Sequence, residues 1–211
     1  MKKRILCFGD SNTWGAVPNT PDRFPEDVRW TGILAKELGD DYQVIEEGLC
    51  GRTTVFTDVI EGRLSGLEYF IPCLDSHSPL DLVILMLGTN DLKTRFNIGP
   101  KCIADGLHRY YNAVRTSQIS GDGPKVLLLS PIMLSPEYKQ HYIFGEMFGD
   151  DAVERSAGFG AAFREAAERF GWEFLDAAKV ASASPEDGLH MGAEDHAKLG
   201  SAVAAKVKEI L

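Results

Sequence analysis

Near its N-terminus the chain carries the stretch Phe8-Gly9-Asp10-Ser11-Asn12-Thr13-Trp14-Gly15. This stretch continues the compact apolar run Ile5-Leu6-Cys7-Phe8, which predicts a first strand. A strand that ends in Gly-Asp-Ser places a hydroxyl at the edge of a sheet, where the chain must turn. Ser11 is therefore a candidate nucleophile, and the chain can be searched for side chains that would activate it.

The composition is that of a soluble globular protein, with 44% hydrophobic and 25% charged residues. Its 211 residues fit one domain, which we expect to span 1–211. A net charge of -9 and a pI of about 5.0 argue against a nucleic-acid surface. The first apolar run is too short for a signal peptide, and no stretch approaches the ~18 apolar residues of a membrane span. We therefore expect a cytoplasmic protein without nucleic-acid or membrane partners.

The four cysteines are widely spaced and form no C-x-x-C pattern. In a reducing compartment such cysteines are expected to be free thiols, and this spacing does not predict a metal cluster. The residues are Cys7, Cys50, Cys73 and Cys102.

Predicted strands alternate with predicted helices along the chain, which is typical of βαβ units and a parallel sheet. The strongest strand is 82–87, whose residues are all apolar, as in a central strand covered by helices on both faces. We predict a three-layer α/β/α sandwich with roughly five parallel strands. The other strands are expected at 5–8, 42–46, 126–129 and 172–176. Helices are expected at 30–38, 67–77, 103–119, 152–170 and 193–211, with a turn at 121–124.

Residues 131–151 form the one long stretch without a regular pattern, and it is rich in apolar side chains. A loop of this length inside a compact domain needs a reason. We expect it to line or cover a pocket, or to pack against another subunit. The candidate substrate-binding residues are Ile143, Phe144 and Phe148 from this loop, together with Trp14.

Residues able to carry acyl-transfer chemistry follow the predicted strands. Ser11 follows the first strand, Gly48–Gly51 the second and Asn90 the central one, while Asp187 and His190 lie in a loop after the last strand. Because ligands bind beyond the carboxyl ends of parallel strands, we expect these groups to share one edge of the sheet. A hydroxyl, an imidazole, a carboxylate and fixed hydrogen-bond donors are the parts that such a reaction requires.

Each of these residues also has a simpler interpretation. Ser11 could cap a turn, Asn90 could be a turn amide, and Asp91 could cap the following turn. The run after the first strand could also bind a phosphate or flavin through its backbone N–H groups. The charges of Arg52 and Lys93 are expected to be solvated. Three histidines are expected to be surface or structural residues, because no carboxylate or cysteine is recognised at ligand spacing from them, namely His77, His141 and His196.

The letters Asp-Gly-Leu-His occur twice, at 105–108 and at 187–190. The first copy lies in a helical pattern, whereas the second lies in a loop behind Pro185 and ahead of the last helix. We therefore assign the acid and base to Asp187 and His190 rather than to Asp105 and His108.

Four blocks in this order resemble the SGNH hydrolases, also called the GDSL esterase family. They are Gly9-Asp10-Ser11-Asn12-Thr13-Trp14-Gly15, Glu47-Gly48-Leu49-Cys50-Gly51-Arg52-Thr53, Gly88-Thr89-Asn90-Asp91 and Asp187-Gly188-Leu189-His190. Asn12 replaces the leucine that gives the family its GDSL name, and no role is assigned to it. The resemblance implies a flavodoxin-like SGNH hydrolase fold.

The resemblance also implies a role for each site residue. Ser11 would be the nucleophile, His190 its general base, and Asp187 the carboxylate that orients the imidazole. The backbone N–H groups of Ser11 and Gly51 and the side-chain amide of Asn90 would form the oxyanion hole. No metal or organic cofactor is implied.

Within the family the chain is most similar to small bacterial arylesterases that also transfer acyl groups, through segments 28–32, 44–49 and 85–91. This implies hydrolysis of short-chain, acetyl-type esters of aryl or alkyl alcohols, with transfer to alcohols or peroxide as a further activity. It also implies a homo-oligomer, for which an octamer is the candidate. A carbohydrate O-acetyl esterase is the alternative within the same chemistry, and a flavin- or phosphate-binding module is the alternative from a different class.

Overall fold

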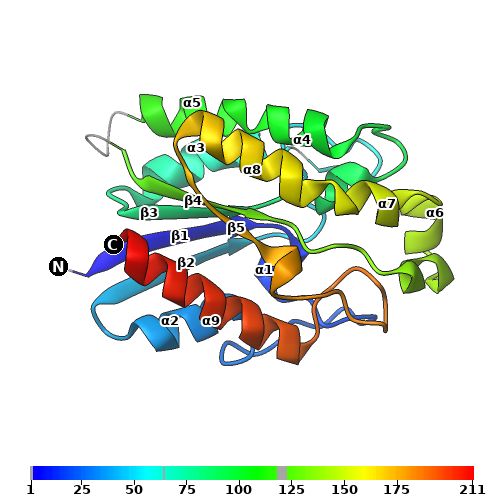
Figure 1. Ribbon diagram of the computed structural model, residues 1–211, viewed down its shortest axis with the longest axis horizontal. Coiled ribbons are helices and arrows are strands. Elements are labelled where there is room, and N and C mark those ends of the chain that lie inside the picture. Colours follow the sequence, from blue (N-terminus) through cyan, green and yellow to red (C-terminus); the bar gives the residue numbers. More distant parts are fainter. Residues whose placement is uncertain (1, 64, 118–122) are drawn as a thin grey trace.

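A single five-stranded parallel sheet forms the centre of the protein, in the strand order β2-β1-β3-β4-β5 (Figure 1). The computed structural model describes residues 2–63, 65–117 and 123–211. Its strands are β1 (Lys3–Gly9), β2 (Tyr42–Gly48), β3 (Leu82–Met86), β4 (Lys125–Ser130) and β5 (Glu173–Asp176). All four strand pairs are parallel, and β3 lies in the middle with every residue buried. The predicted parallel sheet and its central strand are confirmed.

Helices cover both faces of this sheet (Figure 1). One face packs against α2 (Trp30–Leu38) and α9 (Ala193–Ile210). The other packs against α3 (Gly66–His77), α4 (Pro100–Gly106), α5 (His108–Thr116) and α8 (Phe159–Phe170). Shorter elements are α1 (Ser11–Trp14), α6 (Phe144–Phe148), α7 (Ala152–Ala157), and the 3-10 turns η1 (Thr89–Leu92), η2 (Pro136–Gln140) and η3 (Ala177–Lys179).

The two apolar cores follow from the alternation of side chains along each strand. In β1, Ile5 and Cys7 belong to the core beneath α2 and α9, while Leu6 and Phe8 belong to the core on the opposite face. Burial of both faces explains why the strands appear as continuous apolar runs in the sequence.

Two predicted helices are interrupted in the structure. The helix predicted at 103–119 divides at Leu107 into α4 and α5, and that predicted at 152–170 divides at Gly158 into α7 and α8. A Cβ atom at Gly158 would lie 2.8 Å from Pro100, so the second break lets α4 approach closely. Residues 118 and 119 of the predicted helix and residues 121 and 122 of the predicted turn lie outside the described part of the chain.

The stretch 131–151, predicted to be an irregular loop, contains two short helical elements, η2 and α6. Pro136 begins η2, where a missing N–H costs nothing, and Gly149 ends α6 with a positive φ of 70°. The stretch also supports the loop that carries Asp187 and His190, because Ser135 N–H donates to the Gly188 carbonyl at 2.9 Å.

Among residues 2–63, 65–117 and 123–211, no helix combines the length and the apolar character needed to cross a membrane. The cytoplasmic location stays a prediction.

Candidate active site

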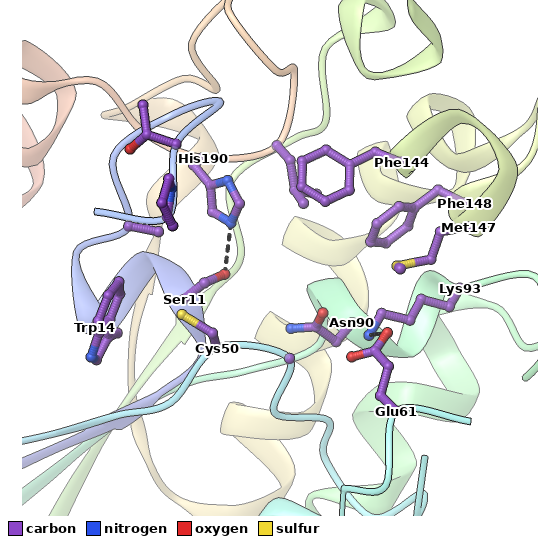
Figure 2. Close-up of a pocket in the computed structure, with 15 residues that line it drawn as sticks. Ser11, Trp14, Cys50, Glu61, Asn90, Lys93, Phe144, Met147, Phe148 and His190 are labelled. Atoms are coloured by element: carbon purple, nitrogen blue, oxygen red, sulfur yellow. Dashed lines mark hydrogen bonds and ion pairs between the residues drawn. The ribbon is translucent and has the colours of Figure 1, made fainter. Parts of the chain in front are cut away.

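Ser11, His190 and Asp187 form a hydrogen-bonded series beyond the carboxyl ends of the strands. Figure 2 shows its contact between Ser11 and His190. The Ser11 Oγ lies 2.9 Å from His190 Nε2, and His190 Nδ1 lies 2.7 Å from Asp187 Oδ2. The carboxylate accepts a hydrogen bond from Nδ1–H, so Nε2 carries a lone pair that can accept the serine proton. The arrangement is that of an activated nucleophile with an oriented base.

A sharp turn from β1 into α1 positions Ser11. The Asp10 carboxylate caps α1 by accepting a hydrogen bond from Asn12 N–H at 3.0 Å, and Gly15 ends this short helix with a left-handed φ of 88°. A Cβ atom at Gly9 would lie 2.0 Å from Thr13 Oγ1, and one at Gly48 would lie 2.1 Å from the Trp14 backbone nitrogen. Both glycines are therefore required by close packing against α1.

The Asn12 side chain connects the nucleophile to the loop that carries His190. Its Nδ2 donates to the Leu189 carbonyl at 3.3 Å, and its Oδ1 accepts from Met191 N–H at 2.9 Å. It thus contacts the backbone on both sides of His190. The sequence assigned this residue no role, because its partners lie more than 170 positions away.

Asp187 is fully buried and accepts four hydrogen bonds. Its Oδ1 accepts from the backbone N–H groups of Leu189 and His190, both at 2.9 Å. Its Oδ2 accepts from Asn19 N–H at 3.1 Å as well as from the imidazole. Burial alone would raise the pKa of Asp187, but the hydrogen bonds and charge of His190 outweigh it and hold the pKa below its ordinary value. The carboxylate is therefore ionised at neutral pH. Asn19, whose N–H donates to this carboxylate, was not indicated by any sequence pattern.

The three groups expected to bind an oxyanion line one cavity with the serine hydroxyl. Ser11, Gly51 and Asn90 all belong to its wall. Gly51 adopts a left-handed φ of 78°, which favours glycine at this position. The Asn90 amide donates one hydrogen bond to the Arg52 carbonyl at 3.1 Å, which fixes its orientation and leaves its second N–H available.

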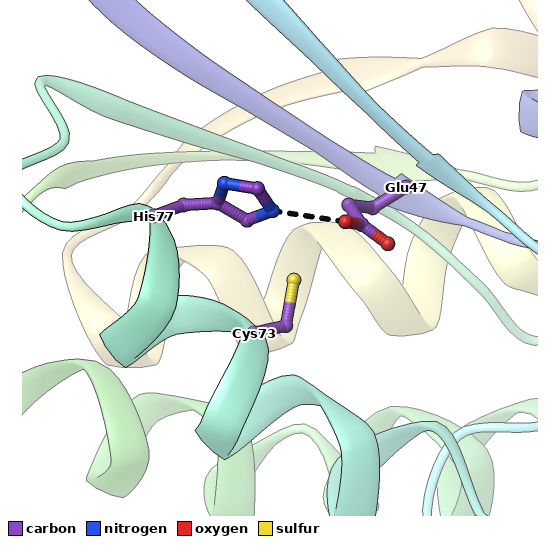
Figure 3. A group of neighbouring side chains, drawn as sticks. All are labelled: Glu47, Cys73 and His77. Atoms are coloured by element: carbon purple, nitrogen blue, oxygen red, sulfur yellow. Dashed lines mark hydrogen bonds and ion pairs between the residues drawn. The ribbon is translucent and has the colours of Figure 1, made fainter.

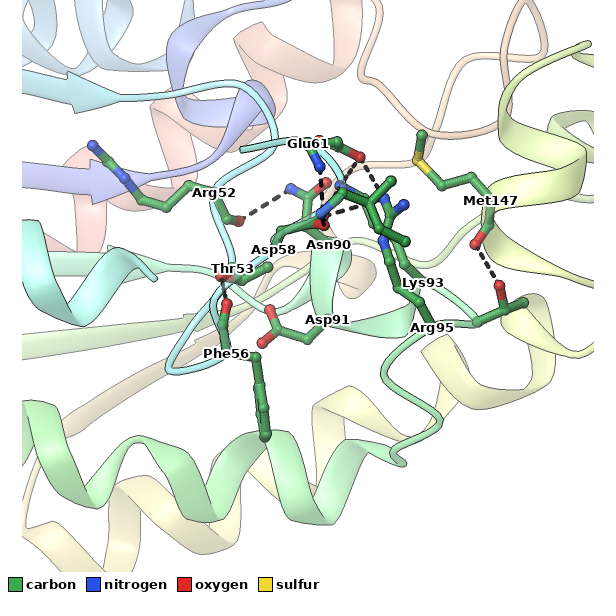
Figure 4. Close-up of polar contacts among 12 residues, drawn as sticks. Arg52, Thr53, Phe56, Asp58, Glu61, Asn90, Asp91, Lys93, Arg95 and Met147 are labelled. Carbon is green, nitrogen blue, oxygen red and sulfur yellow. Dashed lines mark hydrogen bonds and ion pairs between the residues drawn. The ribbon is translucent and has the colours of Figure 1, made fainter. Parts of the chain in front are cut away.

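Arg52 and Asp91 are buried and hold the Gly51 and Asn90 loops together, which corrects two predictions (Figure 4). Arg52 Nη1 donates to the Gly9 carbonyl at 2.8 Å, so the predicted solvated charge is structural. Asp91 accepts from Thr54 N–H at 3.0 Å and from Thr54 Oγ1 at 2.6 Å, so it does not cap the next turn. Burial raises the pKa of Asp91 to about 7.

The cavity beside Ser11 has a volume of about 260 Å³, and its walls are mostly apolar. Trp14, Phe144 and Phe148 line it, joined by Met147, which was not among the predicted substrate-binding residues. Ile143 lines instead an adjoining cavity of about 340 Å³ that also reaches His190. Phe144 lines both cavities and therefore lies between them, whereas Ile143 lines the second one alone.

His141 holds Phe144 in place, a role that the sequence did not indicate. Their rings stack with centroids 4.1 Å apart, and His141 Nδ1 accepts from Phe144 N–H at 3.3 Å. Phe144 in turn contacts the His190 ring edge to face at 5.8 Å.

Lys93 and Glu61 form a charged region in the cavity wall (Figure 4). Lys93 was expected to be solvated, but it is 1% exposed and pairs with Glu61 at 2.6 Å and with Asp58 at 3.4 Å. Arg95 joins the network through Asp58 at 3.1 Å. The segment 58–63 brings these carboxylates to Lys93 from a distant part of the chain, and local sequence carries no signal for such a contact.

The remaining histidines lie in different environments. His108 is exposed in the first turn of α5 and packs against Tyr111 and Phe170. His196 is buried, accepts from Trp30 N–H at 3.3 Å, and has its pKa lowered to about 4, mainly by burial. Contrary to prediction, His77 does have a carboxylate partner, because its Nε2 lies 2.9 Å from a Glu47 oxygen.

The start of α1 is a poor phosphate site. Its N–H groups at Asn12, Thr13 and Trp14 already donate to the side chain or carbonyl of Asp10. Asp10 also places a carboxyl where a phosphate would approach. These contacts weigh against the alternative of a flavin- or phosphate-binding module.

Comparison with known proteins agrees with this geometry. No curated protein is matched by the chain. Among solved structures, the native aryl esterase of M. smegmatis is 42% identical, with a TM-score of 0.94 over 99% of this chain and 100% of that one. A carbohydrate acetylesterase from Sinorhizobium meliloti is 40% identical, with a TM-score of 0.94 over 100% of both chains.

The family comparison covers most of the chain. A model of the GDSL-like lipase/acylhydrolase family matches residues 7–198. The two esterase structures are thus similar to this protein both in sequence and in their α/β fold. The chain belongs to the GDSL-like lipase/acylhydrolase family, the SGNH hydrolases.

Proposed function

We propose that the protein is a serine esterase that cleaves short-chain acyl esters through an acyl-enzyme. The observation that carries the proposal is the series Ser11–His190–Asp187, with distances of 2.9 and 2.7 Å, opening into an apolar-walled cavity. Both similar structures named above are structures of esterases, which supports the same reaction class.

In the proposed reaction Ser11 Oγ attacks the ester carbonyl while His190 Nε2 takes the hydroxyl proton. Asp187 stabilises the imidazolium that forms. The imidazolium then gives its proton to the departing alcohol oxygen, and a water repeats the sequence on the acyl-enzyme. The Ser11 and Gly51 N–H groups and the free N–H of Asn90 would stabilise the oxyanion, each worth about 3 kcal/mol.

The cavity supports a preference for small esters. Its volume of about 260 Å³ is at the lower end for small-molecule sites, and Trp14, Phe144, Met147 and Phe148 give it apolar surface. We therefore propose acetyl-type esters of aryl or small alkyl alcohols as substrates. These walls also limit water around the acyl group, which supports acyl transfer to alcohols or peroxide as a second outcome. Formation of benzyl acetate from phenyl acetate and benzyl alcohol would test the transfer.

Removal of acetyl groups from carbohydrates is the second candidate, favoured by one specific observation. Glu61 and Lys93 place charged groups in the cavity wall, where they could bind hydroxyl groups of a sugar. Relative rates on an acetylated xyloside and on phenyl acetate distinguish the two candidates. A higher kcat/KM on the acetylated xyloside than on phenyl acetate would show that the carbohydrate ester is the preferred substrate.

The decisive experiment uses Ser11→Ala with His108→Ala as the matched control. We expect Ser11→Ala to abolish hydrolysis of phenyl acetate while its circular dichroism spectrum is unchanged, and we expect His108→Ala to retain most activity. An organophosphate should label Ser11 in the native protein. Undiminished hydrolysis by Ser11→Ala would refute the mechanism, and an inactive His108→Ala beside an active His190→Ala would reverse the assignment of the base.

We further propose that the protein is a homo-oligomer, with an octamer as the form to be tested. Large apolar side chains are exposed at Val59 (81%), Ile60 (70%) and Tyr142 (81%), on segments next to the cavity. Contact with another subunit would bury them. A monomeric mass in solution by light scattering would contradict this proposal.

A further inference from the structure

Glu47, Cys73 and His77 form a cluster of potential metal ligands outside the cavity that contains Ser11 (Figure 3). Glu47 lies near the end of β2, and Cys73 and His77 lie on α3. The carboxylate, thiol and imidazole each offer one ligand atom, and these atoms lie within 4.8 Å of one another. We propose that this cluster binds one thiophilic divalent cation, with Zn²⁺ as the ion of best fit.

The positions of the three residues suit a shared ion. Cys73 and His77 are four residues apart on one helix, so their side chains project from the same face. The His77 Nε2 already lies 2.9 Å from Glu47 Oε1. Bonds of about 2.0–2.3 Å in a tetrahedral zinc site place ligand atoms roughly 3.3–3.8 Å apart. Movements of the ligand atoms by about 1 Å, through side-chain rotation, would therefore convert the present contacts into that geometry.

Access to the cluster is one-sided. The side chains of His77 and Glu47 are 28% and 20% exposed, whereas Cys73 is 1% exposed. An ion would thus enter from solvent between the imidazole and the carboxylate and meet the thiol on the inner side. Three protein ligands leave a fourth position, which a water molecule would fill.

The donor set selects the class of ion. One sulfur, one nitrogen and one oxygen suit Zn²⁺ or Co²⁺, whereas Mg²⁺ and Ca²⁺ require oxygen ligands. The thiolate is the metal-binding form of cysteine, so the ion displaces the Cys73 thiol proton to solvent when it binds. The resulting thiolate and the carboxylate supply two negative charges for a divalent ion.

Arg52 is a positive charge near this cluster, and its hydrogen bonds go to backbone carbonyls rather than to the Glu47 carboxylate. Its Nη1 donates to the backbone carbonyls of Gly9 and Glu47, and its guanidinium lies over the Phe8 ring at 4.1 Å. The Glu47 carboxylate faces His77 instead.

Cobalt titration of the metal-free full-length protein tests the proposal, because a cobalt–thiolate bond gives a charge-transfer absorption in the near ultraviolet. We expect this absorption to saturate at one Co²⁺ per chain and to disappear when Zn²⁺ is added. It should be absent in Cys73→Ala, and the affinity for Co²⁺ should fall on the order of tenfold or more in His77→Ala.

Two controls keep the result specific to this cluster. Cys102→Ser changes an exposed thiol elsewhere and should leave the absorption unchanged. Ser11→Ala should also leave it unchanged, so the outcome is independent of the proposed esterase activity. The proposal is overturned if native protein shows no thiolate absorption at millimolar Co²⁺, if Cys73→Ala retains it, or if Cys102→Ser loses it. Should Cys73→Ala not fold, a normal affinity in folded His77→Ala overturns it as well.

Discussion

Asn12 offers the sharpest test of how the site is held together, because its side chain contacts the backbone on both sides of His190. Asn12→Ala removes the hydrogen bond to the Leu189 carbonyl at 3.3 Å and the one from Met191 N–H at 2.9 Å. Both partners belong to buried residues, 4% and 0% exposed, so water does not readily replace the lost amide. The substitution leaves Ser11, His190 and Asp187 chemically intact.

The size of the effect follows from these two contacts. Leaving a buried donor and a buried acceptor unpaired costs about 1–3 kcal/mol each, so we expect a loss of about 2–6 kcal/mol in unfolding free energy. For a protein of this size the melting temperature should fall by roughly 4–24 °C. Displacement of the imidazole from Ser11 should lower kcat on the order of 10–100-fold. KM should change less, because the apolar walls of the cavity are untouched.

The assay combines urea denaturation with kinetics on phenyl acetate at a temperature where the variant is folded. Asn112→Ala, an exposed asparagine on α5, is the matched control and should alter stability by no more than about 0.5 kcal/mol. Wild-type kcat in Asn12→Ala would refute the positioning role, even if stability fell. Wild-type stability would refute the hydrogen-bond argument.

Three further predictions concern other charged groups of the site. Asp187→Asn should lower kcat on phenyl acetate by about 10⁴-fold with an unchanged circular dichroism spectrum, and near-native turnover would count against an orienting carboxylate. Lys93→Met should cost about 3 kcal/mol in urea unfolding because it leaves Glu61 and Asp58 with one cation fewer, and it should lower kcat/KM more for an acetylated xyloside than for phenyl acetate. In Asp91→Asn the carboxyl with a pKa raised to about 7 is absent. Because unfolded Asp91 loses its proton at a lower pH than folded Asp91 does, wild-type stability relative to this variant should decrease from about pH 4 to about pH 7, and a constant or increasing difference in urea unfolding would contradict the shift.

The fold was predictable because burial on both faces of the sheet leaves a strong local signal. The strand 82–87 appears as six consecutive apolar residues, and helix α2 matches the predicted range 30–38. The errors occur where tertiary contacts override a helical pattern. The break at Gly158 accommodates Pro100 from another helix, and no periodicity within 152–170 reports that contact.

The candidate site was predictable to the extent that it lies at strand ends. Ser11 lies two residues after β1 and Asn90 four residues after β3, and adjacent parallel strands bring their carboxyl ends together. The roles of Asn12 and Lys93 were not predicted, because their partners come from distant segments. Asn12 contacts the loop at 189–191, and Lys93 pairs with the carboxylates of Asp58 and Glu61. Burial of an ordinarily exposed residue type depends on such partners, which composition and spacing do not reveal.

The reactive groups of the cavity and its apolar and charged walls come from different segments of the chain. Ser11, Gly51 and Asn90 stand just beyond the ends of β1, β2 and β3, whose register is fixed by the sheet. Asp187 and His190 lie in a loop that Asn12 holds against the turn after β1. The walls of the cavity come from segments 58–63 and 141–148, which are held by side-chain contacts such as the stacking of His141 on Phe144. Changes in these two segments can alter the volume and polarity around the ester without moving Ser11 from His190. Such a separation lets one arrangement of reactive groups act on esters of different size and polarity.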